Sequence, residues 1–156
     1  MSEEVRIRPV ASDDLPIFFE YESDPEAAKM AVFESRDRAS FDEHWAKTMR
    51  DERNIVRAIE AAGVVVGNIG SWEHDGERYV GYWIGREHWG RGMATAALAA
   101  LVAELTDRPL FAHVADTNAA SIRVLEKSGF RRIGEPTADA DADGVVELHY
   151  RLDEAG

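Results

Sequence analysis

The segment from Tyr82 to Leu98 constrains the fold of this chain most strongly, because an apolar strand, a turn with two glycines and an alanine-rich helix follow one another directly. It reads Tyr-Trp-Ile-Gly-Arg-Glu-His-Trp-Gly-Arg-Gly-Met-Ala-Thr-Ala-Ala-Leu. The first N–H groups of a helix have no partner inside the helix, and the helix dipole favours negative charge at that end. A phosphate can bind there through the backbone alone, so we predict a phosphate-binding turn.

Two well-known phosphate loops do not fit this turn. The P-loop ends in Gly-Lys-Ser/Thr, a triplet that the chain lacks. The dinucleotide fingerprint Gly-x-Gly-x-x-Gly needs a third glycine where Thr95 follows Gly90 and Gly92. The sequence therefore predicts a phosphate turn of another kind.

The turn resembles that of the GNAT superfamily of N-acetyltransferases, whose signature Gln/Arg-x-x-Gly-x-Gly/Ala is met here by Gly92 and Ala94. Trp89 departs from it, since it stands where the signature has Gln or Arg. The run Trp-Gly-Arg-Gly-x-Ala-Thr is similar to the variant of the subgroup that resembles ribosomal-protein N-terminal acetyltransferases. We interpret Trp89 as a mark of that subgroup.

A second segment, from Asn118 to Phe130, resembles the other signature of the same superfamily. Asn118 is a good capping residue, Ser121 follows three residues later, and the run Val-Leu-Glu-Lys-Ser-Gly-Phe ends at a glycine that can stop a helix. The two motifs occur in the family's order, joined by a helix and a strand. The resemblance covers nearly the whole chain.

The resemblance implies acetyl-CoA as the cosubstrate and no metal. In this family the backbone amides of the turn hold the pyrophosphate, and the strand before it pairs with the pantetheine arm, in a slot where two central strands splay apart. The implied contacts on this chain are Trp83, Ile84, Gly85, Trp89, Gly90, Arg91, Gly92, Met93, Ala94, Thr95, Asn118, Ser121 and Lys127.

Composition limits the remaining classes. With 156 residues, 45% of them hydrophobic, we expect a single domain over 1–156, which the resemblance implies is an N-acetyltransferase domain. The chain has no cysteine, which excludes disulfides, thiolate metal sites and a cysteine acyl-enzyme, so acyl transfer is expected to be direct. We found neither a signal peptide nor an apolar run of about 20 residues, and expect a cytoplasmic protein with no membrane contact.

The net charge of −12 repels polyphosphate chains and anionic lipid and attracts amines and cationic peptides. Nucleic acid is therefore not an expected partner. Acidity can equally serve solubility alone, so the charge by itself does not identify a substrate. The motifs specify no oligomer interface, and a monomer and a homodimer both stay open.

Hydrophobic periodicity predicts an α/β (α+β) fold, with a mixed, mostly antiparallel sheet of about seven strands and helices on both faces. We expect turns at Ala62-Gly63 and Asp75-Gly76. The expected strands are Val5 to Val10, Asn54 to Ala61, Val64 to Trp72, Arg78 to Ile84, Leu110 to Val114, Phe130 to Ile133 and Val145 to Leu152. The expected helices run from a cap within Ser12-Asp13-Asp14 to about Tyr21, from a Ser40 cap to Arg50, from Ala94 to Leu105 and from the Asn118 cap to Gly129, with loop and a short helix between Glu22 and Ala39.

Acetyl transfer to an amine needs a base for the incoming ammonium and an acid for the departing thiolate. The family's tyrosine in the second motif is replaced by Leu125, and the resemblance to the ribosomal-protein acetyltransferase subgroup implies Ser121 as the acid in its place, with helix capping as its alternative role. His113 is the candidate base, because an imidazole titrates near neutral pH, although a packed strand histidine is equally consistent with the sequence. Glu34, Glu73 and Glu77 stay open as bases acting through water.

Aromatic rings can hold an ammonium group, and we expect Phe33 and Trp72 to contact the acceptor. The spacing of Asp139, Asp141 and Asp143 is similar to a calcium loop but lacks the closing Glu, so no metal is expected. The sequence thus predicts an acetyl-CoA-dependent N-acetyltransferase acting on a primary amine, either a peptide N-terminus or a small molecule. A CoA-binding sensor or partner module without catalysis is the alternative.

Overall fold

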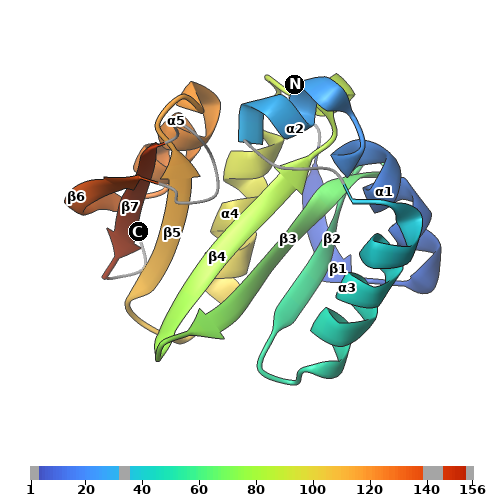
Figure 1. The fold of residues 1–156 in the computed structure, drawn as a ribbon, viewed down its shortest axis with the longest axis horizontal. Coiled ribbons are helices and arrows are strands. Elements are labelled where there is room, and N and C mark those ends of the chain that lie inside the picture. The colour runs from blue at the N-terminus through green and yellow to red at the C-terminus, as the bar shows by residue number, and fades with distance from the viewer. Residues whose placement is uncertain (1–3, 32–35, 139–145, 154–156) are drawn as a thin grey trace.

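The structure is a computed structural model, and it describes residues 4–31, 36–138 and 146–153. Seven strands form one sheet in the order β1-β2-β3-β4-β5-β7-β6 (Figure 1). All neighbouring pairs are antiparallel except β4 and β5, which are parallel. The strands are β1 (Val5–Pro9), β2 (Ile55–Ala61), β3 (Val64–His74), β4 (Glu77–Ile84), β5 (Leu110–Ala115), β6 (Arg131–Ala138) and β7 (Val146–Leu152).

Helices lie on both faces of this sheet. In Figure 1, α1 and α3 lie in front of the sheet and α4 lies behind it. The expected mixed, mostly antiparallel sheet of about seven strands with helices on both faces is confirmed. The helices are α1 (Leu15–Glu22), α2 (Pro25–Ala31), α3 (Arg38–Arg50), α4 (Met93–Glu104) and α5 (Ala119–Lys127), with single 3-10 turns η1 (Ser12–Asp14) and η2 (Arg86–His88).

Two hydrophobic cores fill the two faces. Ala58 and Ile59 are neighbours on β2 and are both fully buried, yet they belong to different cores because successive strand residues point to opposite sides. The core under α1 and α3 is small and aromatic, and includes Phe18, Phe41 and Trp45. The larger core packs α4 and part of α5 against the strands. The sheet is therefore anchored from both sides.

Local residues account for the turns and for most helix ends. Ala62 and Asp75 have positive φ values of 52° and 51°, each followed by a glycine, so both expected two-residue hairpins are present. The Asn118 side chain accepts from Ser121 N at 3.2 Å, which confirms the cap of α5. The Ser40 cap is wrong: α3 begins at Arg38, because Asp37 Oδ1 accepts from Ser40 N at 2.8 Å.

A buried ion pair fixes the first strand to the turn that follows it. Arg8 on β1 donates from Nη1 and Nη2 to the two carboxylate oxygens of Asp14, at 2.8 and 2.9 Å. Asp14 is only 4% exposed, and it also accepts from Ala11 N at 2.7 Å. The guanidinium of Arg8 lowers the pKa of Asp14, opposed by burial and aided by the Ala11 amide.

The sheet opens between β4 and β5. These strands pair only at Arg78 with Leu110 and at Tyr79 with Phe111, within strands that the structure describes completely. Beyond those positions they diverge, and the gap widens towards the C-terminal end of β4 (Figure 1). The expected splayed pair of central strands is thus present, and residues 80–84 and 112–115 border the opening.

Candidate active site

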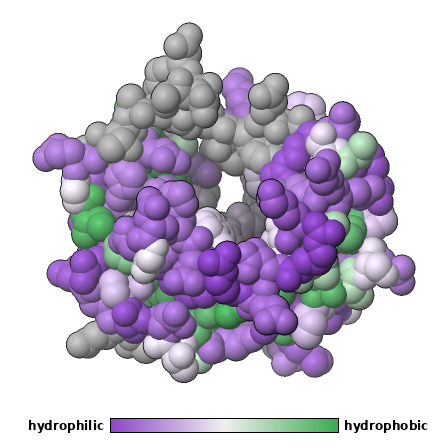
Figure 2. All heavy atoms as spheres, turned by 60° about the horizontal axis from the view of Figure 1, so that its bottom comes forward, coloured by the Kyte–Doolittle hydropathy of each residue, from purple (hydrophilic) through white to green (hydrophobic). Residues whose placement is uncertain are grey.

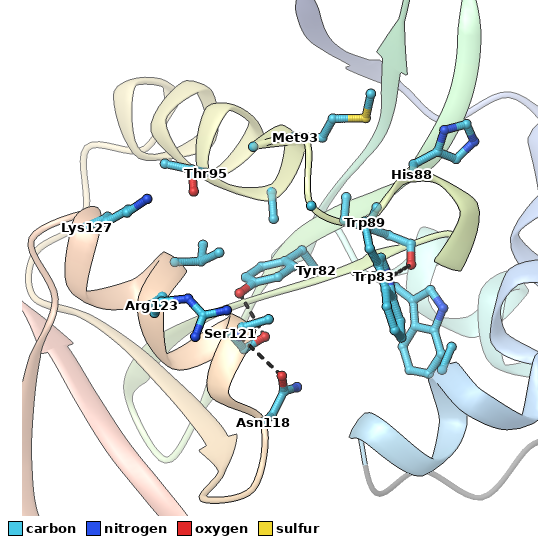
Figure 3. A pocket seen from close by; sticks show the side chains of 17 residues that line it. Tyr82, Trp83, His88, Trp89, Met93, Thr95, Asn118, Ser121, Arg123 and Lys127 are labelled. Carbon is cyan, nitrogen blue, oxygen red and sulfur yellow. Dashed lines mark hydrogen bonds between the residues drawn. The ribbon is translucent and has the colours of Figure 1, made fainter. Parts of the chain in front are cut away.

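A pocket of about 370 Å³ lies at the wide end of this opening (Figure 3). The end of β4, the glycine turn with the first turn of α4, and one face of α5 along its whole length form its walls, and α2 adds one residue. Its lining residues are Ala27, Tyr82, Trp83, Ile84, His88, Trp89, Gly90, Gly92, Met93, Ala94, Thr95, Asn118, Ala120, Ser121, Arg123, Val124 and Lys127.

The glycine turn aims the start of α4 at the pocket. Gly90 and Gly92 have φ values of 78° and 75°, in the left-handed region that glycine adopts without strain. Gly92 is the N-cap of α4, and its carbonyl accepts from Ala96 N at 3.1 Å. The first turn of α4 holds no acidic side chain. The N–H groups at this helix start therefore favour an anion.

A network of side chains holds the turn in place. Trp89 donates from Nε1 to the carbonyl of Ile84 at 2.9 Å, so the residue that departs from the family signature ties the turn back to β4. Arg91 Nη2 lies 2.8 Å from His88 Nδ1, which assigns the imidazole proton to Nε2, since the guanidinium can only donate. That Nε2 lies 3.4 Å from the Tyr21 hydroxyl.

Helix α5 presents a cationic stripe to the pocket. Ala120, Arg123, Val124 and Lys127 are spaced three and four residues apart and share one face of the helix. Figure 3 shows Arg123 and Lys127 extending from α5 into the pocket. Among the described residues that line the pocket none is Asp or Glu, although the chain carries a net charge of −12. The pocket is therefore suited to an anionic ligand.

A hydrogen-bonded chain crosses the pocket from β4 to α5. The Tyr82 hydroxyl donates to Ser121 Oγ at 2.9 Å, and Asn118 Oδ1 accepts from Ser121 N at 3.2 Å (Figure 3). Burial raises the pKa of Tyr82, so this phenol keeps its proton at neutral pH. Because Tyr82 donates to Ser121, the serine can donate its own proton into the pocket.

Most of the residues expected at the cosubstrate come together in this pocket. They are Trp83, Ile84, Trp89, Gly90, Gly92, Met93, Ala94, Thr95, Asn118, Ser121 and Lys127. Gly85 and Arg91 are not among the lining residues. Gly85 N donates to Val66 O at 2.8 Å and Gly85 O accepts from His88 N at 2.9 Å, so both of its backbone groups are already bonded.

The expected base His113 and the expected acceptor residue Trp72 lie on another surface. His113 does not line the pocket, since its strand neighbours Ala112 and Val114 are buried in the core under α4 and His113 points to the opposite face. Trp72 lies on that same opposite face, against Tyr79. Phe33, Glu34 and the loop with Asp139, Asp141 and Asp143 lie outside the described residues.

His113 has the protonation state that a base needs. Burial lowers its pKa from 6.5, and the neighbouring His149 adds to this effect, while Glu147 and Glu77 oppose it and His74 lowers the value further. Its Nδ1 lies 3.7 Å from Glu147 Oε1. The imidazole is therefore neutral at pH 7 and able to accept a proton.

Sequence reasoning missed Ala27, His88, Ala120, Arg123 and Val124 as lining residues. The helical spacing of Arg123 from Lys127 could have placed it on the pocket side. The bond between Tyr82 and Ser121 joins residues 39 positions apart and has no local signal. Leu125, at the family's tyrosine position, is 3% exposed and packs in the core under α4.

Two other kinds of feature, a membrane-spanning helix and a metal-binding cluster, are absent from the described residues. In the described part of the chain, none of the helices combines the length and the apolar character that a bilayer crossing requires. Over residues 4–31, 36–138 and 146–153, no cluster of three or more His, Cys, Asp or Glu side chains is arranged to hold a metal ion.

Comparison with known proteins agrees with this geometry. The profile of the family "Acetyltransferase (GNAT) domain" matches residues 4–131, more than half of the chain. The chain belongs to this family of GNAT acetyltransferases.

Individual relatives and solved structures agree with this family assignment. "Probable N-acetyltransferase YjcK" of Bacillus subtilis (strain 168) is 26% identical over 133 residues, which are 81% of this chain and 70% of the relative. The spermidine N-acetyltransferase of Vibrio cholerae, solved in complex with CoA and spermine, has a TM-score of 0.81 at 18% identity, covering 94% of this chain and 92% of that one. RimL, a ribosomal L7/L12 alpha-N-protein acetyltransferase, has a TM-score of 0.82 at 15% identity, covering 96% and 90%. These two solved structures have the same fold as the present chain.

Proposed function

We propose that this acetyltransferase uses acetyl-CoA and transfers the acetyl group directly to a primary amine. One observation carries the proposal: the start of α4, with Gly90 and Gly92 before it and no carboxylate among the described lining residues, shares one pocket with the Tyr82–Ser121 pair. An anion site and a proton donor within one pocket are what a phosphate-bearing thioester substrate requires.

The residues present fit such a cosubstrate. The N–H groups at the start of α4 would hold its pyrophosphate, and Arg123 and Lys127 would add positive charge on the facing helix. The opening between β4 and β5 offers unpaired strand edges to a narrow, amide-bearing arm. Acetyl-CoA would supply the acyl group in activated form, as a thioester.

Side chains of the protein would donate and accept the protons that acetyl transfer requires. Ser121 holds a proton at Oγ that can be donated into the pocket, and Tyr82 supports it from β4. His113 would accept the amine proton from the far face of the opening, at an imidazole held neutral by burial. The absence of cysteine means that no thiol of this chain carries the acetyl group.

The acceptor is proposed to be a small amine or a peptide N-terminus. The similar structures include a spermidine acetyltransferase and an acetyltransferase for a ribosomal protein N-terminus, so both acceptor types occur with this fold. Four expectations from the sequence stay predictions: a single domain over 1–156, a cytoplasmic location, no nucleic-acid partner, and either a monomer or a homodimer.

A free-thiol assay with acetyl-CoA tests the proposal. Purified protein is incubated with acetyl-CoA and a panel of N-terminal peptides, polyamines and aminoglycosides, and the products are weighed by mass spectrometry. Thiol release that depends on one acceptor class, with one acetyl group added to that amine, is the expected result. Tight CoA binding in calorimetry with no thiol release for any acceptor would contradict transfer and favour the sensor.

A further inference from the structure

Aromatic rings from four adjacent strands lie side by side on the face of the sheet opposite α4. Trp72 on β3 pairs with Tyr79 on β4, Tyr79 pairs with Phe111 on β5, and His113 on β5 pairs with His149 on β7. Ring centroids are 6.2 Å apart for Trp72 and Tyr79, 4.9 Å for Tyr79 and His113 and 4.4 Å for His113 and His149. We call Trp72, Tyr79, Phe111, His113 and His149 the aromatic row.

The row is held rigidly and reaches solvent. The Trp72 indole stacks on Tyr79 with an interplanar angle of 15°, and it covers Gly81 so closely that an added Cβ would lie 2.8 Å from the ring. Trp72 nevertheless keeps 41% of its surface exposed, and the His113 side chain keeps 37%. Exposed rings of this size on one surface are typical of a binding site.

The charges beside the row are mostly negative. Glu77 is on the same face of β4 as Tyr79, and Glu147 lies 3.7 Å from His113. Asp75 follows in the adjoining turn, and with Glu77 and Glu147 it adds to burial in raising the pKa of Tyr79. The end of the sheet that carries this turn faces the viewer in Figure 2, where mostly hydrophilic side chains cover the lower part of the surface. Rings with carboxylates beside them favour a cation.

At one end of the row, a cationic side chain of the protein itself already lies against an aromatic ring and a carboxylate. The guanidinium of Arg151 lies 5.8 Å from the centroid of Phe111, and Asp153 accepts from Arg151 Nε at 2.5 Å. A cation thus contacts both a ring and a carboxylate there. Trp72 and Tyr79, at the other end, have Glu77 and Asp75 close by and lie on the strands that lead to the pocket.

We propose that Trp72, Tyr79, Glu77 and Glu147 form a subsite for a second ammonium group of the acceptor, which makes the preferred acceptor a linear diamine or polyamine. This inference rests on the proposed function. From Tyr79 to Tyr82 the chain advances roughly 10 Å at about 3.3 Å per strand residue. One amine of such an acceptor would contact Trp72 and Tyr79, while the chain carries its other amine past His113 into the opening between β4 and β5.

The test compares a dication with a matched monocation in a binding experiment that needs no catalysis. The full-length protein is titrated with 1,6-diaminohexane and with hexylamine at equal ionic strength, and the imidazole signals of His113 and His149 are followed by NMR. We expect the diamine to bind about ten-fold more tightly than the monoamine, through added charge and cation–π contact. Raised salt should reduce that preference.

Variants identify the residues that cause the preference for the diamine. The double variant Glu77→Gln with Glu147→Gln should reduce the diamine preference to less than about two-fold, and Trp72→Leu should reduce it separately, if both charge and ring contribute. Glu43→Gln is the control variant. Glu43 is an exposed residue of α3, so this change removes a carboxylate outside the proposed subsite and should keep the diamine preference. Thermal unfolding checks that each variant is folded.

The outcomes separate this inference from the function on which it rests. Equal binding of the two amines to the unaltered protein would overturn the subsite, as would a double variant that keeps the full preference. Diamine-selective binding that the double variant loses, without any thiol release from acetyl-CoA, would support the subsite and count against transfer.

Discussion

The Tyr82 hydroxyl donates to Ser121 Oγ across 2.9 Å, and this bond links β4 to α5 on the pocket wall. A phenol on a strand therefore supports the serine hydroxyl in a site where the family's helix tyrosine is replaced by Leu125. The two hydroxyls are best understood as one unit, in which Ser121 faces the pocket and Tyr82 orients it.

Removing either hydroxyl should slow acetyl transfer without weakening CoA binding. We expect Ser121→Ala to lower kcat about 100-fold and Tyr82→Phe about ten-fold, because general acid catalysis commonly contributes about 10²–10⁴. Steady-state kinetics and CoA calorimetry give the two quantities. Tyr150→Phe is the matched control, since its hydroxyl donates to Glu126 Oε2 at 3.1 Å, and neither residue lines the pocket. Full kcat in Ser121→Ala would remove this residue from the acid role.

The left-handed glycine at the start of α4 provides a second test. Gly92→Ala should lower CoA affinity at least about ten-fold, because an alanine there strains the backbone by about 1–2 kcal/mol and shifts the N–H groups of the helix start. Gly76→Ala carries the same strain at φ 77° in the β3–β4 turn, and neither added Cβ meets another atom within 4 Å. The two variants should lose similar stability, but only Gly92→Ala should lose affinity. Equal CoA affinity in both would contradict the phosphate turn.

The rate should depend on pH through His113. Its pKa is lowered, chiefly by burial and then by His149, so the imidazole is neutral at pH 7 and gains a proton only below 6.5. We therefore expect kcat/KM to fall as the pH drops through that lowered pKa, and His113→Gln to be slow with this acid limb removed. His44→Gln is the control, because burial also lowers the pKa of His44, on α3. An unchanged profile for His113→Gln between about pH 6 and 9 would exclude His113 as the base.

Stability in acid should depend on Asp14. Its folded pKa lies below the ordinary value of 3.8, mainly because Arg8 donates to it, so its contribution is fully present above 3.8 and is lost as the pH falls through the lower folded pKa. Asp14→Asn should cost about 1–3 kcal/mol near neutral pH, discounted because Arg8 is one-third exposed, and should flatten this acid dependence. Urea unfolding at several pH values measures both. Asp42→Asn, in an exposed pair with Arg38, should cost less than about 0.5 kcal/mol.

Local signals predicted the fold well. Ala62-Gly63 and Asp75-Gly76 define two-residue turns, and Asn118 and Gly129 begin and end a helix through their own backbone preferences. Ser40 was misplaced as a cap because Asp37, three residues earlier, caps the helix and accepts its hydrogen bond from the backbone amide of Ser40 itself.

The site was less predictable because it depends on contacts between distant segments. Alternation along a strand places Tyr82 and His113 on opposite faces of the sheet once Val80 and Ala112 are known to be buried, but burial itself is a tertiary property. The Tyr82–Ser121 bond and the stacking of Trp72 over Gly81 arise only when separate strands and helices meet. Motifs predicted the phosphate turn, and packing determines which side chains lie beside it.

The two-position pairing of β4 with β5 leaves two strand edges facing each other inside the sheet, where most proteins have a continuous ladder. Unpaired edges are sites for adding another strand, and a narrow ligand with its own amides can fill that gap. Such a ligand would join the β5-β7-β6 block to the rest of the sheet. Its binding would add to folding stability, about 2.7 kcal/mol at 100 times its Kd. With the proposed cosubstrate as that ligand, the lifetime of this protein would follow the supply of the molecule it consumes.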